Sequence, residues 1–165
     1  MKGITSFLWF DDQAEDAAKH YVSIFSSLGS SDSQITDVSR YGAAGAEAAG
    51  RSEGSVMTVA FRLDGQDFVA LNGGPEFQFT EAISLMVNCE TQEEVDQFWE
   101  RLSEGGEQRP CGWLKDRYGL SWQVVPTALG QMLQDEDPKR AERVMAAMLQ
   151  MKKIDIDTLR KAYEQ

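Results

Sequence analysis

One order of secondary structure is predicted twice along this chain. Each time a buried strand is followed by an amphipathic helix and then by further strands, over residues 1–75 and again over residues 80–126. An internal repeat of this kind predicts two similar supersecondary modules that share one core. We therefore expect residues 1–126 to form one domain, with a helical segment, residues 127–165, packed on it.

The first module begins with a clear strand and helix. Residues 4–10 are apolar and aromatic, which is typical of a buried strand. Residues 12–28 carry apolar side chains at helical spacing, and Asp11 or Asp12 is expected to cap this helix before Gly29 ends it. Three further strands are expected, over residues 35–41, 55–63 and 66–72.

Glycine-containing segments separate these elements. Asp64-Gly65 suits a type I′ hairpin turn, because both central positions need a positive φ. The stretch Gly42–Gly50 is almost entirely alanine and glycine, and we expect a mobile loop there. Gly73-Gly74-Pro75 is expected to break the chain at the end of the first module.

The second module repeats the pattern with a stronger helix signal. A strand is expected over residues 82–88, and short strands over residues 113–115 and 120–125. Between them, Thr91 and Glu94 form the sequence signature of a capping box at the start of a helix that runs to about residue 104.

Helices are expected after Pro126. Asp137-Pro138 places a cap directly before a proline at the first helical position. Asp155 is expected to begin a last short helix, with Ile154 and Leu159 spaced for a hydrophobic staple. An apolar stripe in this region is expected to pack in a core or a dimer interface, and consists of Val144, Met145, Met148, Leu149 and Met151.

The charge of the chain excludes several classes of partner. There are 16 basic and 27 acidic residues, which gives a net charge of −11. Such a chain repels nucleic-acid backbones and anionic membranes, so neither is an expected partner. With two cysteines, Cys89 and Cys111, and no export signal, we expect reduced thiols in a cytoplasmic protein.

Several segments of the sequence resemble one known family. They are Phe-Leu-Trp-Phe-Asp (7–11), Ala-Leu-Asn-Gly-Gly-Pro (70–75), Val-Asn-Cys-Glu-Thr-Gln-Glu-Glu-Val-Asp (87–96), Cys-Gly-Trp-Leu-Lys-Asp (111–116), Gly-Leu-Ser-Trp-Gln-Val-Val-Pro (119–126) and Met-Lys-Lys-Ile-Asp-Ile (151–156). In this order they resemble the PhnB-like, 3-demethylubiquinone-9 3-methyltransferase-like family of the vicinal oxygen chelate superfamily. The resemblance implies an α+β fold, in which two βαβββ modules form a curved mixed sheet around a cavity.

The superfamily pattern also implies positions for a divalent metal. Its usual ligands are two histidines and a glutamate, and the matching positions here resemble Thr5, Ala82 and Gln123. Threonine and glutamine are neutral, weak oxygen ligands, and alanine offers none. We therefore expect neither a metal nor another cofactor, and no lyase or dioxygenase chemistry that depends on a metal as Lewis acid.

Strand alternation extends these positions to a candidate ligand pocket. If Thr5, Ala82 and Gln123 face the cavity, the residues two positions away on each strand face it too. The opposite strand faces, which include Ile4 and Ile83, are apolar and are expected to pack against helices. The candidate pocket residues are Thr5, Phe7, Trp9, Asn72, Ser84, Met86, Trp113, Ser121 and Gln123. We expect this pocket to be uncharged and to orient a small molecule.

Other residues have competing structural and functional interpretations. Asn72 is either a strand-end turn residue or an amide that contacts ligand. Cys111 is expected to be a buried inert thiol, because catalysis would need a nearby base and His20 is predicted on a distant helix. Asp116 is expected to cap a hairpin turn.

Three functions from different classes remain open. The first is a metal-free protein that binds a small molecule, with or without catalysis. The second is methyl transfer, although the glycines do not form the usual strand–loop–helix site for S-adenosylmethionine. The third is sequestration of a ligand by a homodimer without turnover. The residues name no catalytic group and no particular ligand.

Overall fold

The computed structural model describes residues 3–28 and 32–165, and Gly29 lies outside them. The chain divides after Phe79 into two compact units, and each is described by itself. The first contains β1 (Ser6–Phe10), α1 (Ala14–Ser27), β2 (Gln34–Arg40), α2 (Ala43–Ala49), β3 (Val56–Leu63) and β4 (Gln66–Asn72). The second contains β5 (Leu85–Cys89), α3 (Gln92–Ser103), β6 (Glu107–Gln108), β7 (Trp113–Lys115), β8 (Ser121–Pro126), α4 (Thr127–Leu133), α5 (Pro138–Met148) and α6 (Ile156–Glu164).

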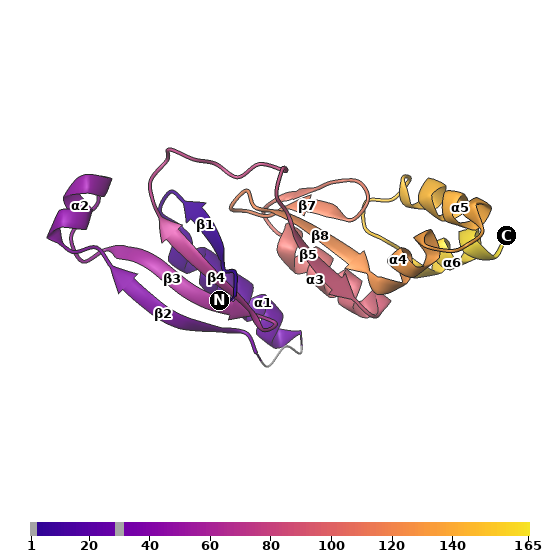
Figure 1. Cartoon of the computed structure of the whole chain (residues 1–165), viewed down its shortest axis with the longest axis horizontal. Coiled ribbons are helices and arrows are strands. Elements are labelled where there is room, and N and C mark those ends of the chain that lie inside the picture. The colour runs from indigo at the N-terminus through magenta and orange to yellow at the C-terminus, as the bar shows by residue number, and fades with distance from the viewer. Residues whose placement is uncertain (1–2, 29–31) are drawn as a thin grey trace. The chain divides into compact units, whose positions relative to one another are not determined.

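The two units repeat one sheet topology. Their strand orders are β1-β4-β3-β2 and β5-β8-β7-β6. In each unit the first strand pairs in parallel with the last, and the other pairs are antiparallel. Figure 1 shows one helix lying along each sheet, α1 in the first unit and α3 in the second. The predicted α+β fold with two βαβββ modules is confirmed, whereas the prediction of one shared domain stays a prediction.

Alternation along the strands of the first unit builds its core. The side chains that face α1 are buried, and they include Leu8, Phe10, Val59, Phe61, Phe68 and Ala70. Phe61 stacks on Phe68 with ring centroids 5.3 Å apart, and Tyr21 of α1 approaches Phe61 at 6.3 Å. The hairpin between β3 and β4 turns as predicted, because Asp64 and Gly65 have φ values of 46° and 79°.

Two predictions for the first unit are wrong. The segment 42–50 forms α2 instead of a loop, because alanine has the highest helix propensity and Gly50, with φ of 63°, ends the helix in the left-handed region. Neither Asp11 nor Asp12 caps α1, whose N-cap is Gln13 without a side-chain bond. The side-chain oxygen of Asn72, at the end of β4, accepts a hydrogen bond from the Ala14 N–H at 2.8 Å. Asn72 therefore takes the role of a capping side chain for α1.

The predicted start of the second module is also partly wrong. β5 begins at Leu85, so Ala82 lies in the preceding turn and Ser84 directly before the strand. Ile4 and Ile83 precede their strands and are exposed, instead of packing against a helix. The capping box is confirmed: Thr91 accepts from the Glu94 N–H at 3.2 Å, and the Glu94 carboxylate accepts from the Thr91 N–H at 3.3 Å.

The C-terminal helices form a small core of their own within the second unit. It centres on Leu129, Val144, Ile154 and Leu159, with Met148 and Met151 packed against it. Met145 and Leu149 of the predicted stripe are instead exposed. Asp137 and Asp155 cap α5 and α6 as expected. No helix among residues 3–28 and 32–165 is long and apolar enough to cross a membrane.

A buried carboxylate organises the turn into β8. Asp116 is 3% exposed and accepts from the N–H groups of Tyr118 at 2.8 Å and Leu120 at 3.0 Å. Its second oxygen accepts from the indole N–H of Trp122 at 2.8 Å. The expected structural role of Asp116 is therefore confirmed, and it fixes the register at which β8 follows β7.

Replacing this carboxylate tests its role in the fold. Asp116→Ala leaves two backbone donors and one indole donor without their acceptor, so we expect the free energy of unfolding to fall by about 3 kcal/mol or more. Urea denaturation followed by circular dichroism measures the change. Glu136→Ala removes an exposed carboxylate from the same unit and serves as the control. Equal stability of the two variants would contradict the assigned role.

Candidate functional site

In the first unit, the sheet face opposite α1 carries two rows of paired residues. One row runs through Trp9, Leu71, Thr58 and Ser39, and the next through Phe7, Val69, Ala60 and Asp37. The Ser39 and Thr58 hydroxyls are hydrogen bonded at 2.5 Å. This face therefore combines aromatic side chains with a few hydroxyl groups and the carboxylate of Asp37, and it carries Phe7 and Trp9 as strand alternation predicts.

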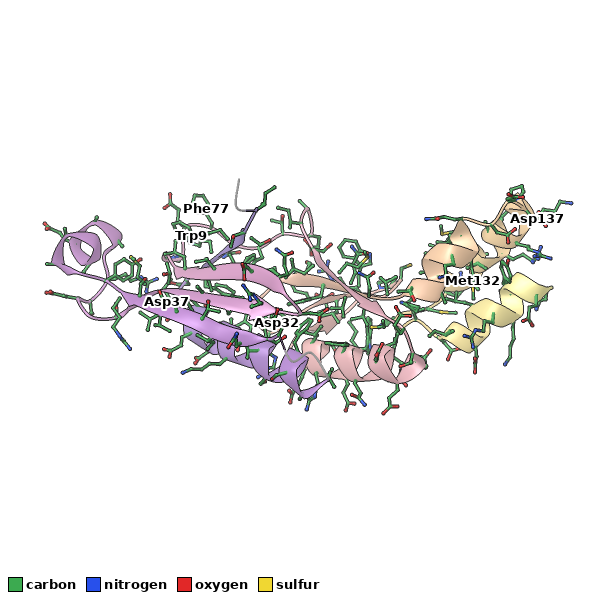
Figure 2. All side chains as sticks on the ribbon, turned by 60° about the horizontal axis from the view of Figure 1, so that its bottom comes forward. Trp9, Asp32, Asp37, Phe77, Met132 and Asp137 are labelled. Atoms are coloured by element: carbon green, nitrogen blue, oxygen red, sulfur yellow. The ribbon has the colours of Figure 1, made fainter. Side chains whose placement is uncertain are left out.

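Trp9 is held in place by the segment that follows β4. Its indole N–H donates to the Gly74 carbonyl at 2.9 Å, and the Phe77 ring meets it edge-on at 5.0 Å. Figure 2 shows the two side chains together on one side of the sheet. A Cβ atom on Gly73 would lie 2.3 Å from the indole ring, so Trp9 needs a glycine at this position. Phe7 is 59% exposed, and Thr5 is exposed just before β1.

Asn72 is buried at the end of β4 and is bonded within the protein. Its side-chain oxygen accepts from Ala14, and its amide nitrogen donates to the Val56 carbonyl at 3.1 Å. The Tyr41 hydroxyl donates to the Asn72 carbonyl at 2.7 Å. These contacts join β4 to α1, to β3 and to the segment before α2, and they favour the structural interpretation of this residue.

A hollow of about 270 Å³ opens beside Asn72 in the first unit. It is lined by Asp12, Glu15, Asp16, Arg51, Ser55, Val56 and Asn72. Arg51 bonds the Asp11 carboxylate at 2.8 Å and also its carbonyl. The lining of the hollow is mostly charged, unlike the aromatic pocket that the sequence predicts.

In the second unit, three predicted residues stand in one row on the face opposite α3. Gln123 of β8 lies between Met86 of β5 and Trp113 of β7 in the strand register. The Gln123 amide donates to the Ser84 hydroxyl at 2.9 Å. The structure thus brings Ser84, Met86, Trp113 and Gln123 together, with an amide–hydroxyl pair among larger apolar side chains.

The same face is charged, contrary to the prediction. Lys115 has the same orientation as Trp113 and pairs in register with Ser121. Its ammonium group contacts Glu81 at 3.0 Å, and Arg109 also bonds Glu81 and contacts Glu107 at 3.2 Å. Alternation along residues 113–115 could have revealed Lys115, whereas Glu81 and Arg109 lie outside regular strands and carry no comparable signal.

The two cations determine the ionisation of Glu81. A hydrogen bond from Lys115, with further bonds from the Glu81 backbone and from Arg109, lowers the pKa of Glu81 to about 2. The carboxylate is therefore charged above that pH, and the cluster loses its central anion only in strong acid.

The residues at the metal positions that the resemblance implies do not fit a divalent metal. Thr5 is a neutral, exposed side chain, and Ala82 has no donor atom. Gln123 directs its amide nitrogen to Ser84. Among residues 3–28 and 32–165 no group of three His, Cys, Asp or Glu side chains could hold a metal ion. We therefore derive no step through a metal.

The cysteines do not form a nucleophilic site of the usual kind. Both are free, and burial raises the pKa of the Cys89 thiol to about 12. Cys111 is only half-buried, and its thiol lies 3.9 Å from the Met148 carbonyl, which is not a base. Its backbone N–H donates to Met151, so this segment anchors the chain before α6.

Comparison with known proteins agrees with the topology of the two units. A family model described as 3-demethylubiquinone-9 3-methyltransferase matches residues 2–125. A Bacillus cereus PhnB protein, given the same methyltransferase description, is 36% identical over 76% of this chain and all of its own, with a TM-score of 0.63. The chain therefore belongs to this PhnB-like, 3-demethylubiquinone-9 3-methyltransferase family.

More distant structures share the fold alone. A Pseudomonas aeruginosa protein is 17% identical over 76% of this chain and 98% of its own, with a TM-score of 0.58. The fosfomycin resistance protein FosX from Listeria monocytogenes is 16% identical over 82% of this chain and 99% of its own, with a TM-score of 0.54. No protein with a curated description matches the chain significantly.

Replacement of Asn72 separates its structural and ligand-binding interpretations. Asn72→Ala removes the acceptor for Ala14 and the donor to Val56, so we expect the free energy of unfolding to fall by about 2–3 kcal/mol. Urea denaturation measures this, and Asn88→Ala, at an exposed position of β5, is the control. A variant with unchanged stability but weaker ligand binding would contradict the structural role.

Proposed function

We propose that this protein binds a small molecule without the divalent metal of its superfamily. The observation that carries the proposal is the row formed by Met86, Gln123 and Trp113, next to Ser84. Ligand sites typically surround a few oriented polar groups with apolar and aromatic surface, and this row has that composition. Trp9 and Phe7 give the first unit's sheet a similar face.

The polar groups of this row suit recognition better than chemistry. The Gln123 amide and the Ser84 hydroxyl donate and accept hydrogen bonds, and neither is an acid or a base near neutral pH. The Trp113 ring offers a flat apolar surface beside them. Each proposed contact therefore orients a ligand. In the second unit the proposed site residues are Ser84, Met86, Trp113, Ser121 and Gln123, and in the first unit Thr5, Phe7 and Trp9 remain predictions.

A screen with defined probes tests the binding row. We expect neutral aromatic amides from a fragment library to bind the full chain, and Gln123→Leu to weaken that binding about tenfold, because the amide loses its hydrogen bonds. Ligand-observed NMR measures binding. Gln97→Leu, on an exposed position of α3, is the matched control. Binding that Gln123→Leu leaves unchanged would overturn the assignment of this row.

S-adenosylmethionine belongs among the probes, since the family description names a methyltransferase. Binding of this cofactor that depends on Trp113 would favour methyl transfer over ligand binding alone. Turnover of the bound compound, or its absence, then separates an enzyme from a sequestering protein.

Metal titration tests the metal-free part of the proposal. Calorimetry with Mn²⁺, Zn²⁺, Ni²⁺ and Fe²⁺ is expected to show no tight one-to-one binding, because Thr5, Ala82 and Gln123 supply at most two neutral oxygen donors. Replacing all three residues by His, His and Glu should create metal affinity if these positions correspond to the superfamily site. Stoichiometric binding by the natural chain that Gln123→Leu abolishes would refute the metal-free function.

We also propose a homodimer in the cytoplasm. Large apolar side chains outside the proposed ligand-binding residues are exposed on both units, among them Ile4, Ile83 and Leu149, and a second copy would bury such surface. Both cysteines are free, which fits a reducing compartment. Light scattering of the full chain measures the mass in solution.

A further inference from the structure

Two cations in this acidic protein converge on a single carboxylate. Arg109 follows β6 and Lys115 ends β7, and their side chains are 30% and 29% exposed. Both contact the same oxygen of Glu81. Glu107 of β6 also contacts Arg109. The result is a compact cationic pair that lies on the face opposite α3, beside the row of Trp113 and Gln123.

Polar atoms next to this pair lack partners. Ser121 is 1% exposed and lies directly opposite Lys115 in the β7–β8 register, yet its hydroxyl has no hydrogen-bond partner within the described chain. The Nε atom of Arg109 is likewise buried and without a partner there. Buried polar groups are nearly always bonded, so a buried hydroxyl and a guanidinium N–H beside a cation pair point to an absent acceptor.

Glu81 has the properties of a displaceable stand-in for that acceptor. It lies in the turn before β5, outside any regular element, and its side chain is 43% exposed. Its carboxylate supplies the oxygen chemistry that Arg and Lys recognise in phosphate and carboxylate ligands. Because the Glu81 side of these ion pairs is exposed and lies outside any helix or strand, exchanging Glu81 for a ligand oxyanion costs the fold little.

We infer that Arg109, Lys115 and Ser121 form a subsite for the oxyanion group of a small ligand, and that this group displaces Glu81. Arg109 and Lys115 would donate charge-assisted hydrogen bonds to it, and the Ser121 hydroxyl would donate a third bond. The body of the ligand then extends over Trp113 and Gln123. This inference rests on the proposed ligand-binding role of that row and adds the charge of the ligand to it.

Titration of the full chain with inorganic phosphate, at constant ionic strength, tests the subsite. We expect one-to-one binding by calorimetry. Lys115→Gln should weaken it about tenfold or more, because a charge-assisted bond is lost, and Glu81→Gln should strengthen it, because the competing anion is removed. Lys153→Gln breaks a comparable ion pair with Asp96 in the same unit and should leave binding unchanged.

The remaining outcomes decide against the inference or refine it. Absence of binding in both the natural chain and Glu81→Gln overturns it, as does equal weakening by Lys115→Gln and Lys153→Gln. Acetate in place of phosphate separates the sources: tighter phosphate binding supports a doubly charged ligand, and tighter acetate binding supports a carboxylate.

The two proposals fail in different experiments. Neutral fragments that depend on Gln123, together with no phosphate binding, would leave the ligand-binding row standing and remove the subsite. Phosphate binding that depends on Lys115, together with no effect of Gln123→Leu on any organic probe, would leave the subsite standing and remove the ligand-binding row. Thermal melting of each variant confirms that it is folded before binding is compared.

Discussion

The structure depends on one constraint, namely that each sheet buries one of its faces against a single helix. In the first unit α1 covers the side chains of Phe10, Phe61 and Phe68, and in the second α3 covers those of Leu114, Trp122 and Val124. Successive side chains of a strand point to opposite faces, so this burial also decides which residues stand on the other face. The binding row and the position of Lys115 are both consequences of that choice.

Two buried polar residues keep the strands in the register that this burial requires. Asn72, at the end of β4, accepts a hydrogen bond from the first N–H of α1. Asp116 accepts hydrogen bonds from the backbone of the turn into β8 and from the indole N–H of Trp122. In each case a side chain takes the hydrogen bond that local backbone cannot make. Neither residue is free to serve a ligand without loss of these contacts, although both resemble polar site residues in the sequence.

Local chemistry explains which elements could be predicted from the sequence. Thr91 with Glu94, Asp137 with Pro138, and Asp64 with Gly65 are short-range signals, and the backbone follows them closely. The start of α1 could not be predicted, because its first N–H is satisfied by Asn72, 58 residues away. The prediction of a loop over Gly42–Gly50 was wrong for a local reason. The glycines of this segment suggested a loop, whereas its alanines favour a helix.

The candidate site shows the same division between local and distant information. The strand register brings Met86, Gln123 and Trp113 to one face, and alternation along β7 would have placed the charge of Lys115 there as well. Glu81 and Arg109 join that charge from irregular segments, which no strand period describes.

Neutralisation by the protein's own carboxylates explains how such a pair fits a chain with a net charge of −11. Glu81 and Glu107 balance Arg109 and Lys115 in the free protein, so a ligand anion must exchange with Glu81 and cannot simply add to exposed positive charge. Exposed charges are screened beyond about 8 Å at physiological salt, so the net negative charge of the chain acts mainly on a ligand that extends across its surface. A long polyanion meets that repulsion along its length, whereas a small oxyanion needs to approach only at the cation pair. The net negative charge and the cationic pair therefore select together for a compact ligand with its charge at one end.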